Sequence, residues 1–177
     1  MQKYISVVLL IILGIVCRFL PHPANFAPIG AIALFGAIYL PSRWSLFITL
    51  PAMFVSDIFI GFYSWPIMVA VYSSFILMAI IGSHIKKNKK FHTILGGTLL
   101  GSILFFLITN WAVWAFGSIY THNFSGLLQS YHMAIPFFRN SLLGDFFYTF
   151  VLIGGIELVN FIKSYKSSLQ TISLTHN

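Results

Sequence analysis

Residues 91–117 read FHTILGGTLLGSILFFLITNWAVWAFG, without a single Asp, Glu, Lys, Arg or Pro. A transmembrane helix needs about 20 consecutive, predominantly apolar residues. This run is longer than that and contains no helix-breaking proline. It therefore predicts a membrane-spanning helix.

Five further apolar runs lie between proline, glycine and charged breakers. They cover residues 3–20, 28–40, 44–62, 66–85 and 139–162. Pro28 and Pro66 suit the first turn of a helix, whereas Pro51 lies inside the third run and is expected to kink it. The sequence predicts an all-α integral membrane protein of six transmembrane helices, with one domain over residues 1–166 and a cytoplasmic tail at 167–177.

Composition excludes several classes of protein. With 58% hydrophobic and 7% charged residues, the chain has no room for a sizeable soluble domain. Its formal charge of +7 comes from cations at the ends of apolar runs, so we expect no nucleic-acid partner. The single Cys17 excludes an intrachain disulfide. No group of His, Cys, Asp or Glu has metal-ligand spacing, and no glycine-rich nucleotide loop occurs, so neither a metal nor a cofactor is expected.

The first run resembles a secretory signal peptide, but no small-residue cleavage site follows it, and we expect a retained helix. If the N-terminus is cytoplasmic, eight of the ten basic residues lie on the cytoplasmic side. The eight are Lys3, Arg43, Lys86, Lys87, Lys89, Lys90, Lys163 and Lys166; the two outside are Arg18 and Arg139. Because basic loops stay inside, this bias predicts that both termini are cytoplasmic (N-in, C-in).

All three acidic residues, Asp57, Asp145 and Glu157, lie within apolar runs. A charge near the bilayer centre costs at least about 2.5 kcal/mol, so such groups are usually paired and often functional. Glu157 is expected to be structural, at the inner interface. The other two acids belong to a set of polar and aromatic residues that the orientation places at one outer level. These candidate substrate-binding residues are Arg18, His22, Asn25, Asp57, Asn110, Trp111, Trp114, Arg139, Asn140 and Asp145.

Polar residues on one side only indicate a pocket open to the exterior, because a channel would place them through the full depth. Two purely structural interpretations stay open. Asp57 could simply pair with Arg18, and Asp145 with Arg139. The tryptophans could be interfacial residues alone, and His22 a solvated loop residue.

Three local features complete the prediction. The second run starts near Pro28 at the same outer level, where a helix N-terminus offers free N–H groups. Residues 118–138 are expected to form a long outer loop, either a lid over the pocket or a surface loop. Small residues four apart, Ala33 with Ala37 and Gly97 with Gly101, indicate close helix packing within this chain or against a partner.

Four segments carry a resemblance to a known family: RFLPHPANFAP at 18–28, GAIALFG at 30–36, the Ser56-Asp57 pair, and IPFFRNSLLGD at 135–145. They resemble a family of small bacterial membrane proteins to which a transport role is ascribed. That family is similar to the S components of energy-coupling factor (ECF) transporters, which are six-helix proteins that capture a vitamin-like micronutrient and dock onto an ATP-driven module.

The resemblance implies a multi-pass protein of the bacterial inner membrane with a small-molecule substrate, and as partners membrane lipid, an ECF-type transmembrane subunit and ATPases. S components often carry an Ala-xxx-Ala docking motif in their first helix. Here that spacing occurs in the second run, so Ala33 and Ala37 are the candidate docking residues.

The leading functional hypothesis is a substrate-binding membrane subunit for uptake of a small polar or heteroaromatic micronutrient. The alternatives are a self-sufficient ion-coupled carrier, against which no inverted repeat is visible, and a membrane scaffold protein without a ligand. An enzyme is not expected, because no nucleophile and base stand at a recognisable spacing.

Overall fold

The computed structural model describes residues 2–40 and 48–175, and these residues form helices without any strand. The helices are α1 (Gln2–Phe19), α2 (Ile29–Tyr39), α4 (Thr49–Ile60), α5 (Trp65–Ile85), α6 (Phe91–Phe116) and α7 (Phe124–Thr175). The predicted all-α class is confirmed. Arg43 and the predicted start of the third run at residue 44 lie outside the described residues.

Three of these helices are long and apolar enough to cross a membrane: α5, α6 and the Phe124–Tyr165 part of α7. Large apolar side chains are exposed on the outer faces of the bundle, as a lipid environment allows. Examples are Phe54, Ile58 and Phe59 on α4, Leu100 and Leu107 on α6, and Leu143, Phe147 and Val151 on α7.

Two predicted spans are shorter in the structure than in the sequence pattern. α2 has 11 residues and α4 has 12, below the length that a lone transmembrane helix needs. Pro51 was expected to kink the third span. It lies instead in the first turn of α4, where its missing N–H leaves no helical hydrogen bond unmade.

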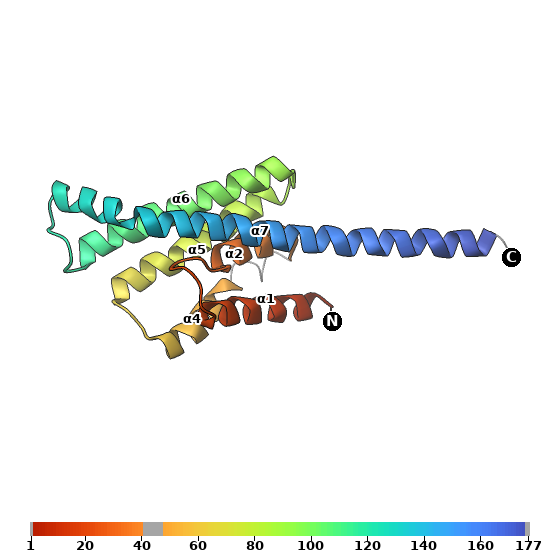
Figure 1. The fold of residues 1–177 in the computed structure, drawn as a ribbon, viewed down its shortest axis with the longest axis horizontal. Coiled ribbons are helices and arrows are strands. Elements are labelled where there is room, and N and C mark those ends of the chain that lie inside the picture. Colours follow the sequence, from red (N-terminus) through yellow and green to blue (C-terminus); the bar gives the residue numbers. More distant parts are fainter. Residues whose placement is uncertain (1, 41–47, 176–177) are drawn as a thin grey trace.

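α2 is the central helix of the bundle (Figure 1). Every residue from Ile29 to Ile38 is buried, and α2 contacts α1, α4, α5, α6 and α7. A helix that is apolar on all sides is stable only when neighbours cover all of it. α2 is short, but protein surrounds it, so it does not need the length of a helix that faces lipid on its own.

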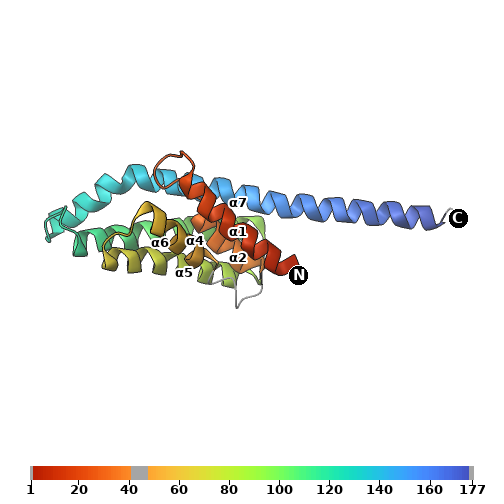
Figure 2. The ribbon, with the colours of Figure 1, turned by 90° about the horizontal axis from the view of Figure 1, so that it is seen from below.

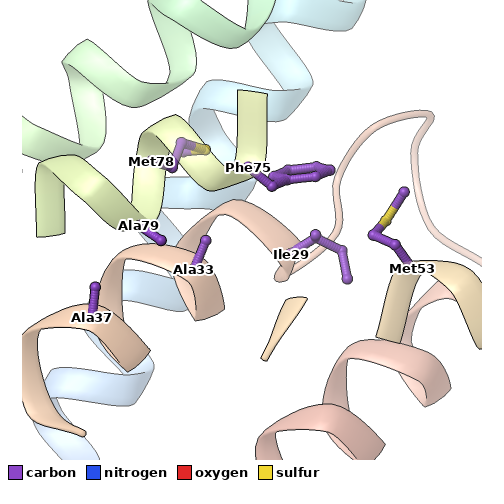
Figure 3. Close-up of a cluster of buried hydrophobic side chains, with 7 residues drawn as sticks. All are labelled: Ile29, Ala33, Ala37, Met53, Phe75, Met78 and Ala79. Atoms are coloured by element: carbon purple, nitrogen blue, oxygen red, sulfur yellow. The ribbon is translucent and has the colours of Figure 1, made fainter. Parts of the chain in front are cut away.

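The small residues of α2 pack inside this chain, which corrects the docking prediction. Ala33 and Ala37 are both 0% exposed and lie against Met78 and Ala79 of α5 (Figure 3). At Gly82 of α5, an added Cβ would lie 2.5 Å from the Leu34 carbonyl oxygen, so the two backbones approach closely. The face that was expected to meet a partner is covered by α5.

The segment 118–138 is mostly helical, not a long loop. α7 starts at Phe124 and includes Pro136, and Figure 2 shows it curving over its N-terminal part and then running on past the bundle. The side chain of Asn123 caps its start, because Oδ1 accepts a 2.8 Å hydrogen bond from the Gly126 backbone N–H. The expected long loop, which was left open as a lid or a surface loop, is therefore wrong, and the sixth helix is much longer than the predicted 139–162.

Candidate functional site

An ion pair joins the C-terminal end of α1 to α4. Arg18 Nη2 lies 2.7 Å from Asp57 Oδ1, with side-chain exposures of 17% and 1%. Arg18 Nη1 donates to Ser56 Oγ at 2.6 Å, and the Tyr72 hydroxyl of α5 donates to Asp57 Oδ2 at 2.8 Å. Within residues 7–40 and 48–165, whose side chains the structure describes, this is the only ion pair between side chains, and each member neutralises the other.

A cavity of about 380 Å³ lies beside this pair, between the α1–α2 connection and helices α2, α4, α5, α6 and α7. Its polar lining comes from Arg18, Asn25, Tyr63, Thr109, Asn110, Ser141 and Asp145. Its aromatic lining comes from Phe75, Phe105, Phe106, Phe137 and Phe138. A volume of this size is within the range of small-molecule sites, which are largely apolar with a few placed polar groups.

Asp145 holds the N-terminus of α2. The Ser102 hydroxyl of α6 donates to Asp145 Oδ2 at 2.7 Å, and the Ala31 backbone N–H donates to the same carboxyl group. The N-cap residue of α2 is Pro28, whose side chain cannot cap the helix, so an acid from α7 fills that role across the bundle. An added Cβ at Gly30 would overlap Asp145 Oδ1, so only glycine lets the carboxylate sit there.

Paired phenyl rings form part of the cavity wall. The Phe75 and Phe105 rings have centroids 5.0 Å apart across α5 and α6. The Phe106 and Phe138 rings are 4.7 Å apart across α6 and α7. Both pairs are tilted, with interplanar angles of 34° and 37°, and they give the wall an aromatic, apolar surface that a planar ligand ring can contact.

Comparison with known protein families places the chain. One family model matches residues 1–169. The chain belongs to DUF6580, a family of unknown function. No curated protein and no solved structure matches it. The function of this DUF6580 protein is therefore inferred from its geometry, and the similarity to ECF S components stays a prediction.

Four of the ten predicted site residues of the DUF6580 protein line the cavity: Arg18, Asn25, Asn110 and Asp145. Asp57 is buried behind Arg18 and does not line the cavity. The sequence-based pairing of Arg18 with Asp57 is thus present, alongside a cavity that Arg18 also borders.

The other five predicted residues lie away from the cavity. Three of them are exposed: His22, which bonds to the Pro23 carbonyl, Trp111 at 47%, and Arg139. The other two bond elsewhere, since Trp114 donates to the Thr121 carbonyl and Asn140 to the Ala24 carbonyl. The expected pair between Arg139 and Asp145 does not form, because Asp145 points to α2 and α6 and its partners are neutral.

Several residues of the site were missed from the sequence. Gly30 lines the cavity, while Ser102 and Tyr72 do not line it but donate hydrogen bonds to Asp145 and Asp57. The paired phenylalanines at 105–106 and 137–138, each close to polar residues, were the signal that could have located the wall.

Tyr63 lines the cavity from the α4–α5 connection, next to Gly61, whose φ of 114° is accessible to glycine. Burial, together with the charge of Asp57, raises the pKa of the Tyr63 phenol to about 12, while Arg18 acts in the opposite direction. Tyr63 is therefore a neutral hydroxyl at physiological pH. No group of three or more His, Cys, Asp or Glu residues in the described part of the chain is arranged to hold a metal ion.

Proposed function

We propose that this DUF6580 protein is a membrane-embedded substrate-binding subunit for uptake of a small polar or heteroaromatic micronutrient. The observation that carries the proposal is the cavity of about 380 Å³, which combines phenyl walls with Asn110, Asp145 and Arg18. Buried polar groups are costly in lipid, and a ligand that bonds to them offsets that cost.

The same proposal includes six membrane crossings with both termini in the cytoplasm. Lys86 to Lys90 connect α5 to α6, while Asn110 and Val113 of the cavity lie near the opposite end of α6. With the basic connection inside, the cavity is nearer the outer surface. The shortness of α2 is compatible with a crossing, because protein covers it on all sides.

Energy for uptake would come from partner proteins. The chain has no Walker-type phosphate loop, so we propose that ATPases and an ECF-type transmembrane subunit in a bacterial inner membrane drive transport. The partner would contact a face other than that of Ala33 and Ala37, since α5 covers those residues. The proposed role is binding and delivery, without catalysis.

Native mass spectrometry of the purified protein tests this proposal. Ala134 lines the cavity and is 7% exposed, so Ala134→Phe would place a ring inside it. Its neighbour Ile135 is 52% exposed and does not line the cavity, so Ile135→Phe is the matched control. We expect a retained small molecule in the wild type and in Ile135→Phe, and its loss in Ala134→Phe.

Retention of the same molecule by Ala134→Phe would place the ligand elsewhere and overturn the proposal. The proposal would also be overturned if the wild-type protein carried no ligand and deletion of its gene left nutrient uptake unchanged. ATPase subunits in the same spectra would support the proposed energy source, and their absence from uptake-competent membranes would refute it.

A further inference from the structure

The charges around the cavity do not balance. Arg18 borders it, but its charge is neutralised by Asp57 at 2.7 Å. Asp145 also borders it, and its described partners are the neutral Ser102 hydroxyl and the neutral Ala31 N–H. With all three groups ionised, one positive and two negative charges leave a net charge of −1 at the site.

A buried carboxylate without a cation is unfavourable, so the Asp145 carboxyl group either binds a proton or is compensated by another positive charge. The α2 N-terminus supplies roughly half a positive charge, which offsets part of the deficit. A carboxylate has about four acceptor positions, and Ser102 and Ala31 account for two. The remaining capacity of Asp145 is on a group that lines the cavity.

Two neutral polar residues of the wall, Thr109 and Asn110, direct donors to their own helix and keep acceptor oxygens. Asn110 Nδ2 donates to the Phe106 carbonyl, and the Thr109 hydroxyl donates to the Phe105 carbonyl. The Thr109 hydroxyl proton and one of the two Asn110 amide N–H groups are thereby used within α6, and the oxygen atoms of both side chains keep lone pairs. A ligand with N–H donors fits such a lining better than one with only acceptors.

The phenyl rings of the cavity wall also favour a cationic ligand. The rings of Phe75 with Phe105 and of Phe106 with Phe138 line the cavity in pairs, and aromatic rings attract cations as well as other planar rings. We propose that the cavity takes a cationic, planar aromatic ligand whose N–H groups bind Asp145. This inference rests on the proposed function, because it names the class of substrate for the same cavity.

Three probes of one shape separate charge from size: benzamidine, a cation at neutral pH, neutral benzamide and anionic benzoate. Binding to the purified protein is measured by equilibrium dialysis and by the shift in thermal unfolding temperature. We expect benzamidine to bind most tightly, benzamide about tenfold or more weakly because it lacks the charge-assisted hydrogen bond, and benzoate most weakly. Ala134→Phe should abolish benzamidine binding, and Ile135→Phe should not.

Variants assign the preference to Asp145. Asp145→Asn should remove the advantage of benzamidine over benzamide. Because Asp145 also caps α2, a second test at Ser141 leaves Asp145 in place. Ser141→Lys adds a cation to the cavity lining and should weaken benzamidine binding about tenfold or more. The uncharged control, Ser141→Gln, should change benzamidine binding little.

Tighter binding of benzoate, or equal binding of all three probes, would overturn the charge assignment while leaving a ligand cavity intact. Absence of binding by any probe would also overturn it. The retained ligand seen by mass spectrometry decides the proposed function independently, since that measurement makes no assumption about ligand charge.

Discussion

The backbone N–H of Ala31 on α2 donates a hydrogen bond to the carboxylate of Asp145 on α7. This bond ties the start of the central helix to the last helix of the chain, directly beside the cavity that both helices line. Gly30 makes the contact possible, since any larger residue would occupy the position of the carboxylate oxygen. Packing of the core and construction of the site therefore depend on the same position.

Gly30→Ala should destabilise the protein by about 1–3 kcal/mol, the usual cost of overpacking a well-filled core. Its Cβ would overlap Asp145 Oδ1 and would lie 2.8 Å from Met78 Cε. Thermal unfolding in detergent, followed by circular dichroism, measures the change. Gly96→Ala on α6 is the matched control, because its Cβ meets nothing within 4 Å, and it should be neutral or stabilising by up to about 1 kcal/mol. An equal loss in both variants would mean that Asp145 does not occupy this position.

The sequence predicted that Asp145 lies at the cavity level, but the partner that it left open, Arg139, is not the one that Asp145 meets. Its depth follows from its place along an apolar run, and depth is what hydropathy reports. Which neighbour it meets depends on the rotation of each helix about its axis, and α7 turns Asp145 toward Ser102 and Ala31 while Arg139 is exposed. Asp57 and Arg18 differ, because both lie at adjacent helix ends where one pairing was already plausible.

Arg18→Met should cost about 3–5 kcal/mol, because it leaves the Asp57 carboxylate buried without a cation. Asp57→Asn should also destabilise, while keeping a hydrogen-bond acceptor for Tyr72. The double variant should lose less stability than the sum of the two single variants, since neither uncompensated charge remains. A double-mutant cycle in thermal or denaturant unfolding gives the coupling energy. Strict additivity would show that the ion pair contributes nothing to folding.

Ala33→Phe should prevent stable folding or cost at least about 1–3 kcal/mol, because Ala33 is 0% exposed against α5. Val55→Phe on α4 is the control, since Val55 is 36% exposed on the outer face. Yield and unfolding temperature after purification measure both. A stable Ala33→Phe protein would restore the idea that this face of α2 is open to a partner.

The helix boundaries show which physical signals the apolar pattern lacks. α5 and α6 end close to where their apolar runs end, because breakers and charged residues coincide there. α7 starts well before its apolar run, since the polar residues of segment 124–138 hid a helix whose start is marked by Asn123. An Asn whose side chain accepts a hydrogen bond from the backbone N–H three residues later is a local sign of a helix start, and it would have replaced the expected loop by a helix. The burial of Ala33 could not be read in the same way, because small-residue spacing does not identify the neighbour.

The orientation prediction concerns the two ends of α6. Asn88 lies in the basic connection before it, and Ile119, 77% exposed, lies in the connection after it. A single cysteine at either position, in a Cys17→Ser background, can be labelled in intact cells with a maleimide that does not cross membranes. If both termini are cytoplasmic, Ile119→Cys is labelled from outside, and Asn88→Cys reacts only after the cells are permeabilised. The reverse pattern would invert the topology and place the cavity toward the cytoplasm, where it could not capture an external nutrient. Labelling of both positions in intact cells would show that α6 does not cross the membrane, and the uptake proposal would fail with it.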